Sequence, residues 1–326
     1  MAFRYSKDQP TGFVNSIERV ALVGAGGRLG SWLAKALVET GRHRVTAITR
    51  AGSTNDLPEG VVIAKVDYSD EASVVQALKG QQVLIITMSV RAPPDSQAKL
   101  VEMASKAGVP YVIPNAWGTD PLDEGLSEKV GFGRRFPLGN ITWIAMACGF
   151  WYEFSLGGST DRYGFDFKER SVTFFDDGTK KINTSTFAQC GRAIAAFLSL
   201  PLLRQDEYDN KPSISDWDND VFRISSFLVS QKDMFESVKR VTGTTDRQWT
   251  ISYENSADRY NNGVEAWEKG DIGGFVRYMY TAVFFPNSGG DYSTSKGLQN
   301  DVLGLPEEDL DEATKEGIRR ALEGIL

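Results

Sequence analysis

Short apolar runs alternate with longer amphipathic stretches from Val20 to about Ala147, and this alternation predicts repeated strand–helix units. Nearly every residue of the runs is apolar, as expected of parallel strands that helices cover on both faces. We expect strands at VALVG, VTAIT, VVIAKV, VLIIT, YVIP and ITWIAMA. Helical stretches run over 29–40, 71–78 and 94–107, and the glycines that mark their ends are Gly41, Gly80 and Gly108. The pattern predicts an α/β fold with a doubly wound parallel sheet.

The pattern changes after Gly149, where aromatic residues, glycines and hairpin-like turns replace the alternation. We therefore divide the chain into a nucleotide-binding domain over residues 1–155 and a smaller α+β substrate-binding region over 156–326. Helical periodicity at 184–200 predicts a buried helix that packs back on the main sheet. A capping pattern at Ser230 and Asp233 predicts the start of another helix, which Gly243 ends.

Glycines follow the first predicted strand in a G-x-x-G-x-x-G register. Between a strand and a helix, such glycines allow a tight turn, close approach of a pyrophosphate to bare backbone, and close helix–sheet packing. The alternative is a glycine-rich turn with no ligand. We predict a Rossmann-type cradle for a dinucleotide, formed by Gly24, Gly26, Gly27, Arg28, Leu29 and Gly30.

Arg50 ends the second predicted strand, where NAD sites usually carry an acidic residue. A guanidinium suits a 2′-phosphate, so this position favours NADPH/NADP+ over NAD, and Arg28 is within reach of the same phosphate. The alternative is two solvated arginines at loop ends. Because ligands bind beyond the carboxyl ends of parallel strands, we also place Asp67 near the adenine, and Met88 and Ser89 near the ribose and nicotinamide.

Composition narrows the range of partners. The 36 basic and 43 acidic residues give an acidic surface that disfavours nucleic acid and anionic lipid. The N-terminus has no signal-like apolar core and no apolar run is long enough to span a membrane, so we expect a soluble, cytoplasmic protein. Cys148 and Cys190 lie far apart in apolar segments, and the single histidine, His43, is expected to be solvated, so no metal site is predicted. The pattern specifies no oligomeric state.

Several segments resemble the NmrA-like branch of atypical short-chain dehydrogenases, which includes isoflavone reductase-like enzymes. The similarity is greatest to the fungal members. The segments are VGAGGRLG, the strand that ends at Arg50, VPYVIPNAWG, ACGFW and INTSTFAQCGRAIAAFLSLP. The resemblance implies an NADP-binding domain, a smaller C-terminal substrate domain, and reduction of a small aromatic or heterocyclic metabolite.

The resemblance also implies a catalytic lysine. In the family's reductases, a lysine in the helix after a P-[SN]-x-[FW]-G segment acts at the nicotinamide. Here that segment is Pro114–Gly118, and Lys129 is the lysine that falls nearest, so we assign it the relay of a proton as hydride moves. The alternative is an exposed helix lysine, because Gly131 and Gly133 interrupt the helix that the family keeps regular.

Other positions follow from the same comparison. Asn115, in the P-[SN]-x-[FW]-G segment, is expected at the cofactor, and so are Gly149 and Phe150, which fall where the family lines the nicotinamide. Aromatic residues concentrate in the substrate region, where most of them are ordinary core and a few suit a flat apolar pocket. The expected substrate-binding residues are Trp117, Trp151, Glu153 and Phe154.

Three functions are compatible with these residues. The leading hypothesis is an NADPH-dependent reductase that transfers hydride to a C=C, C=N or C=O bond of a small aromatic or alkaloid-like secondary metabolite. A second is a redox-neutral condensation or cyclisation on bound NADP, with carboxylates such as Asp161 or Glu153 moving protons. A third is a dinucleotide-sensing regulator, as the family's namesake is. A Y-x-x-x-K match at Tyr292–Lys296 is judged a chance one, because it lies in a serine- and glycine-rich tract near the C-terminus.

Overall fold

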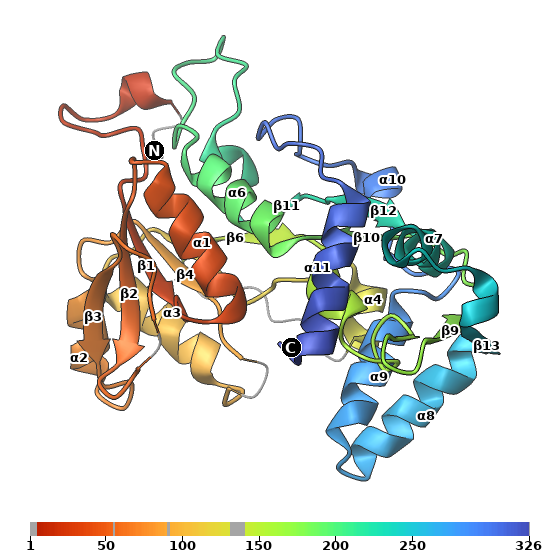
Figure 1. Cartoon of the computed structure of the whole chain (residues 1–326). Helices are drawn as coiled ribbons and strands as arrows, with labels where there is room; N and C mark the ends of the chain where they lie inside the picture. Colours follow the sequence, from red (N-terminus) through yellow and green to blue (C-terminus); the bar gives the residue numbers. More distant parts are fainter. Residues whose placement is uncertain (1–4, 55, 90–91, 131–140, 326) are drawn as a thin grey trace.

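The computed structural model describes residues 5–54, 56–89, 92–130 and 141–325, and within them the main element is a seven-stranded sheet (Figure 1). The strand order is β3-β2-β1-β4-β5-β6-β11, and every neighbouring pair is parallel. The strands are β1 (Arg19–Val23), β2 (Arg44–Arg50), β3 (Val62–Val66), β4 (Val83–Ile86), β5 (Tyr111–Ile113), β6 (Thr142–Ala147) and β11 (Asp220–Arg223). This order confirms the doubly wound parallel sheet.

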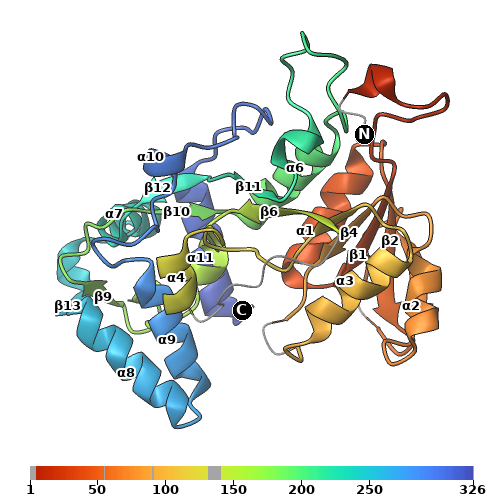
Figure 2. The same cartoon turned by 180° about the vertical axis from the view of Figure 1, so that it is seen from behind.

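Helices cover both faces of the sheet, as the apolar strands require. On one face α1 (Arg28–Glu39) packs against α6 (Phe187–Leu198), and on the other α2 (Glu71–Leu78) packs against α3 (Ser96–Lys106) (Figures 1 and 2). Alternate residues of β1 enter the two cores: Val20 and Leu22 join the α1 and α6 side, whereas Ala21 and Val23 join the α2 and α3 side. The period of two along a strand thus explains why both sets are apolar.

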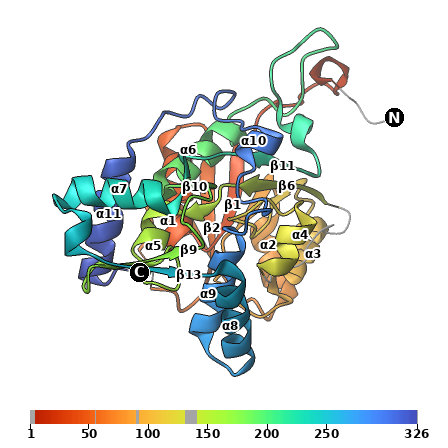
Figure 3. The same cartoon turned by 90° about the vertical axis from the view of Figure 1, so that its right-hand side faces the viewer.

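The C-terminal region surrounds a third, aromatic-rich core. It holds two three-stranded sheets, formed by β7 (Phe150–Trp151), β10 (Ile182–Ser185) and β12 (Phe227–Val229), and by β8 (Phe165–Asp166), β9 (Ser171–Phe175) and β13 (Thr250–Glu254). Its helices are α4 (Glu124–Lys129), α5 (Tyr152–Leu156), α7 (Gln231–Thr242), α8 (Ser256–Glu268), α9 (Ile272–Ala282), α10 (Ser293–Lys296) and α11 (Leu310–Glu323). Short 3-10 helices are Ser6–Asp8, Ile214–Trp217 and Asp246–Gln248. Figure 3 shows α8 and α9 projecting together from the molecule.

The two regions do not separate at one point in the sequence. Both α6 and β11 follow residue 155, yet α6 packs on α1 and β11 pairs with β6. The chain therefore returns to the main sheet after it has entered the C-terminal region. None of the helices in the described ranges combines the length and apolarity needed to span a bilayer.

The expectation that His43 is solvated is wrong. The imidazole is buried, with Nδ1 2.8 Å from the Ile17 carbonyl oxygen and Nε2 3.1 Å from Ser199 Oγ. Burial lowers the pKa of His43, since it disfavours the charged ring. The ring thus links the start of β2 to the end of α6. Its partner there, Ser199, is 156 positions away in the sequence.

Candidate functional site

Two positions of the glycine turn, Gly24 and Gly30, leave no room for a side chain. Gly24 has a φ of +83°, and a Cβ there would overlap the Thr87 carbonyl oxygen. A Cβ on Gly30 would lie 2.8 Å from the Gly24 carbonyl carbon. Gly27 is the N-cap of α1 and provides no side-chain cap, and uncapped N–H groups at a helix N-terminus are suited to bind an anion. Gly26, Arg28 and Leu29 complete this stretch.

The turn lies at the point where the strand order reverses. β1 has β2 on one side and β4 on the other, and the crevice at such a switch point is where doubly wound sheets bind nucleotides. Arg50 ends β2 as an exposed residue, and Asp67 directly follows its neighbour β3. Asp67 Oδ1 accepts hydrogen bonds from the backbone N–H and hydroxyl of Ser69, which lower the pKa of its carboxyl group. The two predicted adenosine contacts thus share one edge of the sheet.

Asn115 and Trp117 form hydrogen bonds that join the segment after β5 to the end of β4. The Asn115 side chain accepts from the Met88 N–H at 3.0 Å and donates to the Met88 carbonyl oxygen at 3.1 Å. Trp117 Nε1 donates to the Ile86 carbonyl oxygen at 2.8 Å. Ser89, next to Met88, is exposed at the same edge. These bonds hold the β4 end against the segment after β5, so the polar groups of Asn115 and Trp117 position the edge.

Gly149 makes the turn that leads from β6 to Phe150. Its φ is +66°, and a Cβ there would lie 2.7 Å from the Asn183 carbonyl carbon. The N–H of Gly149 donates to the Gly118 carbonyl oxygen at 2.9 Å. Phe150 packs 4.3 Å from the Tyr280 ring between centroids, so its side chain belongs to the C-terminal core. The turn thus brings this core to the carboxyl end of the sheet.

Trp151, Glu153 and Phe154 have different surroundings. Trp151 packs 5.1 Å from Phe187 between ring centroids, whereas the Phe154 ring contacts the Arg28 guanidinium at 4.9 Å. Glu153 is only 5% exposed, and its Oε1 accepts from the Phe187 N–H at the start of α6 at 2.9 Å. Its Oε2 has no hydrogen-bond partner among the described residues, and burial raises the pKa of Glu153 to about 7. Phe154 therefore lies beside the glycine turn, and Glu153 lies beneath the surface.

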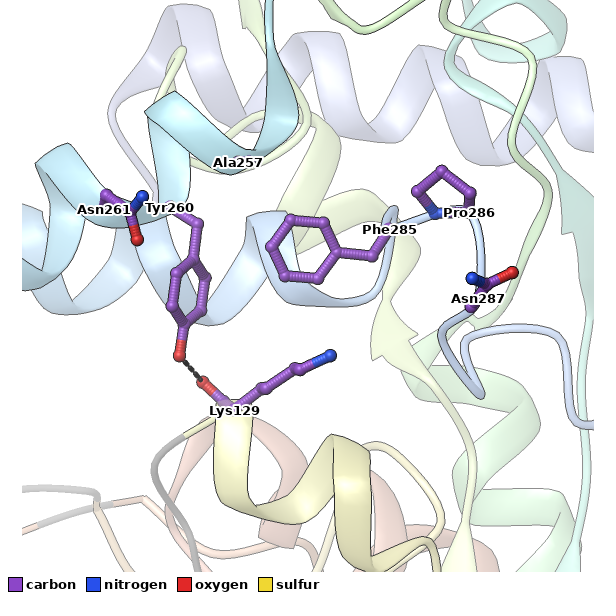
Figure 4. Close-up of a pocket in the computed structure, with 7 residues that line it drawn as sticks. All are labelled: Lys129, Ala257, Tyr260, Asn261, Phe285, Pro286 and Asn287. Carbon is purple, nitrogen blue, oxygen red and sulfur yellow. Dashed lines mark hydrogen bonds between the residues drawn. The ribbon is translucent and has the colours of Figure 1, made fainter.

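Lys129 lies in a cavity of about 410 Å³ between α4, α8 and the segment after α9 (Figure 4). Its Nζ is 5.2 Å from the centroid of the Phe285 ring, and the Tyr260 hydroxyl donates to its carbonyl oxygen at 3.1 Å. The cavity combines one cation with two aromatic rings and two amides. Its lining residues are Lys129, Ala257, Tyr260, Asn261, Phe285, Pro286 and Asn287.

The structure brings most of the predicted cofactor residues together at one sheet edge, and Lys129 lies in the cavity between α4 and α8. Across the described ranges, no hydrogen bond, ion pair or ring contact joins Lys129 to the glycine turn or to Phe150. Gly131 and Gly133, which were expected to interrupt the helix of Lys129, lie outside the described residues. Two residues escaped the sequence analysis: Arg162, beside Phe154, and Tyr260, in the cavity. Tyr260 contacts Lys129, 131 positions away, and Arg162 contacts Phe154, eight positions away; no local motif signals either contact.

The Y-x-x-x-K match has structural roles. The buried Tyr292 hydroxyl donates to the Ile224 carbonyl oxygen at 2.7 Å. Lys296 Nζ pairs with the buried Asp120 carboxylate at 2.7 Å, which also accepts from Arg223 Nε at 2.7 Å. These contacts tie α10 and β11 to the segment after β5. Both side chains are thus used in packing.

Comparison with known proteins agrees with this geometry. Residues 16–130 match the NmrA-like family. Oxidoreductase aprR of Aspergillus flavus is 28% identical over 306 residues, which cover 90% of this chain and 96% of aprR. The chain is therefore similar to the NmrA-like family. Among solved structures, this chain is similar to an isoflavone reductase, with a TM-score of 0.68 and 16% identity over 92% of this chain and 99% of that one.

Two further structures share the fold of this chain. One comes from a study of pinoresinol-lariciresinol and phenylcoumaran benzylic ether reductases, with a TM-score of 0.71 and 17% identity over 90% of this chain and 97% of that one. The other is the NADPH complex of the quinone oxidoreductase QOR2 of Escherichia coli, with a TM-score of 0.63 and 18% identity over 91% of this chain and 98% of that one. At these identities the likeness concerns the fold.

Proposed function

We propose that this chain is an NADPH-dependent reductase of a small aromatic or alkaloid-like secondary metabolite. The observation that carries the proposal is the glycine turn at the switch point, where the N-terminus of α1 has no side-chain cap and Arg50 ends the adjacent strand. A Cβ at Gly24 or Gly30 would overlap Thr87 or Gly24, so this close-packed turn requires glycine, and its bare backbone N–H groups suit a pyrophosphate. The relatives named as oxidoreductases support a redox role.

The chain's own residues then have defined tasks. The N–H groups at the start of α1 bind the pyrophosphate, and Arg50 binds the 2′-phosphate as a planar, bidentate donor. Bound NADPH supplies the hydride for a C=C, C=N or C=O bond. Phe150, which the Gly149 turn places between sheet and C-terminal core, limits access of water to the nicotinamide end. Following reduced-nicotinamide absorbance during conversion of quinone and enone probes tests the reaction, because product without cofactor oxidation would contradict a reductase.

Arg50→Glu is expected to raise the Kd for NADPH by about a hundredfold and to leave the Kd for NADH nearly unchanged. The substitution replaces a phosphate donor by a carboxylate that repels the 2′-phosphate. Fluorescence titration with both dinucleotides measures the effect. Arg44→Glu is the matched control, since Arg44 is an exposed arginine at the opposite end of the same strand. An NADPH affinity that Arg50→Glu leaves intact would disprove the 2′-phosphate assignment.

Lys129→Ala is expected to lower kcat by about a hundredfold while the Kd for NADPH stays the same. We propose that Lys129 supplies the proton and that its aromatic cavity receives the flat substrate, because a cation beside two rings suits an aromatic ligand. Steady-state kinetics separate the roles. A rise in KM at constant kcat would reduce Lys129 to a binding residue. Lys168→Ala, at an exposed lysine, is the control.

A further inference from the structure

Two arginines converge on one aromatic ring beside the glycine turn. Arg28, the first residue of α1, has its guanidinium carbon 4.9 Å from the centroid of the Phe154 ring. Arg162, from the C-terminal region, has its guanidinium carbon 3.7 Å from the same centroid. Arg162 Nη1 also donates to the Phe154 carbonyl oxygen. Both guanidinium groups therefore contact the Phe154 ring, although they are 134 positions apart in the chain.

Arg162 is a partly buried cation that has no carboxylate at ion-pair distance among the described residues. The adjacent Asp161 instead pairs with Arg277, 2.9 Å from its Nε. Burial lowers the pKa of Arg162 and so does the charge of Arg28, whereas Tyr280 and Asp161 act in the opposite direction. A partly desolvated cation near a second cation is unfavourable unless an anion offsets the charge. Among the described residues Asp161 acts on Arg162 through its charge, but its ion pair is with Arg277.

Local packing directs the Arg162 side chain toward Phe154. Gly158 lies under the guanidinium, and a Cβ at Gly158 would overlap Nη1, Cδ and Cζ of Arg162. Phe154 supplies both the ring face and the carbonyl oxygen, so the guanidinium is oriented before any ligand arrives. Its remaining N–H donors are available to a planar or tetrahedral oxyanion.

We infer that Arg28, Phe154 and Arg162 form an oxyanion-binding site at the glycine turn, in which Arg162 binds the pyrophosphate of the dinucleotide from the C-terminal region. The assignment of the pyrophosphate rests on the proposed NADPH-binding function. The pyrophosphate lies at the N-terminus of α1 in folds of this class, and Arg28 is the first residue of that helix. A carboxylate of the substrate offers the same chemistry, so the experiment separates the two sources.

Arg162→Met tests the site without removing the aliphatic stem. The full chain is titrated with NADPH and with NADH by fluorescence, and its thermal unfolding is followed with and without inorganic pyrophosphate. We expect Arg162→Met to raise both Kd values by about tenfold and to lose the pyrophosphate-induced rise in Tm. Arg162→Lys retains the charge but not the planar guanidinium, so its Kd values and its pyrophosphate-induced rise in Tm should lie between those of the wild type and of Arg162→Met. Arg247→Met, at an exposed arginine of a 3-10 helix, is the control.

The outcomes are distinguishable. If Arg162→Met loses only the pyrophosphate effect and binds both dinucleotides normally, the oxyanion site stands and its ligand is the substrate. If neither binding nor the pyrophosphate effect changes, the inference is overturned. A loss confined to NADPH would assign Arg162 to the 2′-phosphate and contradict the pyrophosphate contact. Failure of the wild-type protein to bind either dinucleotide would refute the proposed function, whereas the pyrophosphate measurement still tests the site. The Tm of unliganded Arg162→Met shows whether the variant is folded.

Discussion

Gly24→Ala is expected to destabilise the fold by about 4 kcal/mol or more and to abolish dinucleotide binding. Two costs add at this position. The φ of +83° is a left-handed conformation that strains alanine, and the new Cβ would overlap the Thr87 carbonyl oxygen and lie 2.6 Å from Thr87 Oγ1. Thr87 cannot move away easily, because its N–H donates to the Val23 carbonyl oxygen at 2.9 Å at the end of two paired strands.

Gly108→Ala separates strain from overlap. Gly108 has a φ of +78°, close to that of Gly24, but a Cβ there would meet nothing within 4 Å. We expect this control to cost about 1 kcal/mol, from backbone strain alone. Urea unfolding of both variants measures the difference, and NADPH titration of any folded Gly24→Ala protein measures the loss of the cradle. Equal destabilisation of the two variants would show that close packing at Gly24 is unimportant.

The main sheet could be predicted because most of its strands and helices are marked by patterns within short segments of the sequence. Apolar runs between amphipathic stretches identified β1 to β6, and the helix expected over 71–78 is α2 with the same bounds. The Ser230 and Asp233 capping box and the Gly243 end of α7 are confirmed for the same reason. The expectation that every strand is covered on both faces fails at β3, where Ile63 is 55% exposed. β3 is the edge strand, and sheet order is a property of the whole fold.

The candidate site could be predicted only where one short segment determines it. The glycine turn and the place of Arg50 follow from strand–turn–helix order. The surroundings of Asn115 depend on Met88, and those of Arg28 depend on Phe154, so their hydrogen bonds and ring contacts required the folded chain. The return of β11 to the sheet edge is likewise set by tertiary packing, since only two of its four residues, Val221 and Phe222, are apolar and the sequence gives little strand signal there.

Glu153→Gln is expected to remove a pH dependence of stability worth about 2–3 kcal/mol between about pH 5 and pH 8. Burial raises the pKa of Glu153 from 4.5 to about 7 in the folded protein. Between these values the unfolded chain has released a proton that the folded chain retains. Because the unfolded state then binds fewer protons, the free energy of unfolding falls as pH rises, and it levels off above the folded pKa.

Glutamine isolates this ionisation because it keeps the acceptor oxygen for the Phe187 N–H at the start of α6 and resembles the protonated acid in shape. Urea unfolding at successive pH values should give a wild-type curve that descends toward pH 8 and a flatter Glu153→Gln curve, with the variant more stable above the folded pKa. Glu268→Gln, at an exposed glutamate, should follow the wild type. Wild-type and Glu153→Gln curves that stayed parallel would mean that Glu153 is already ionised in the folded protein near pH 5. In that case Oε2 would have to find a donor that the buried site beside α6 does not show among the described residues.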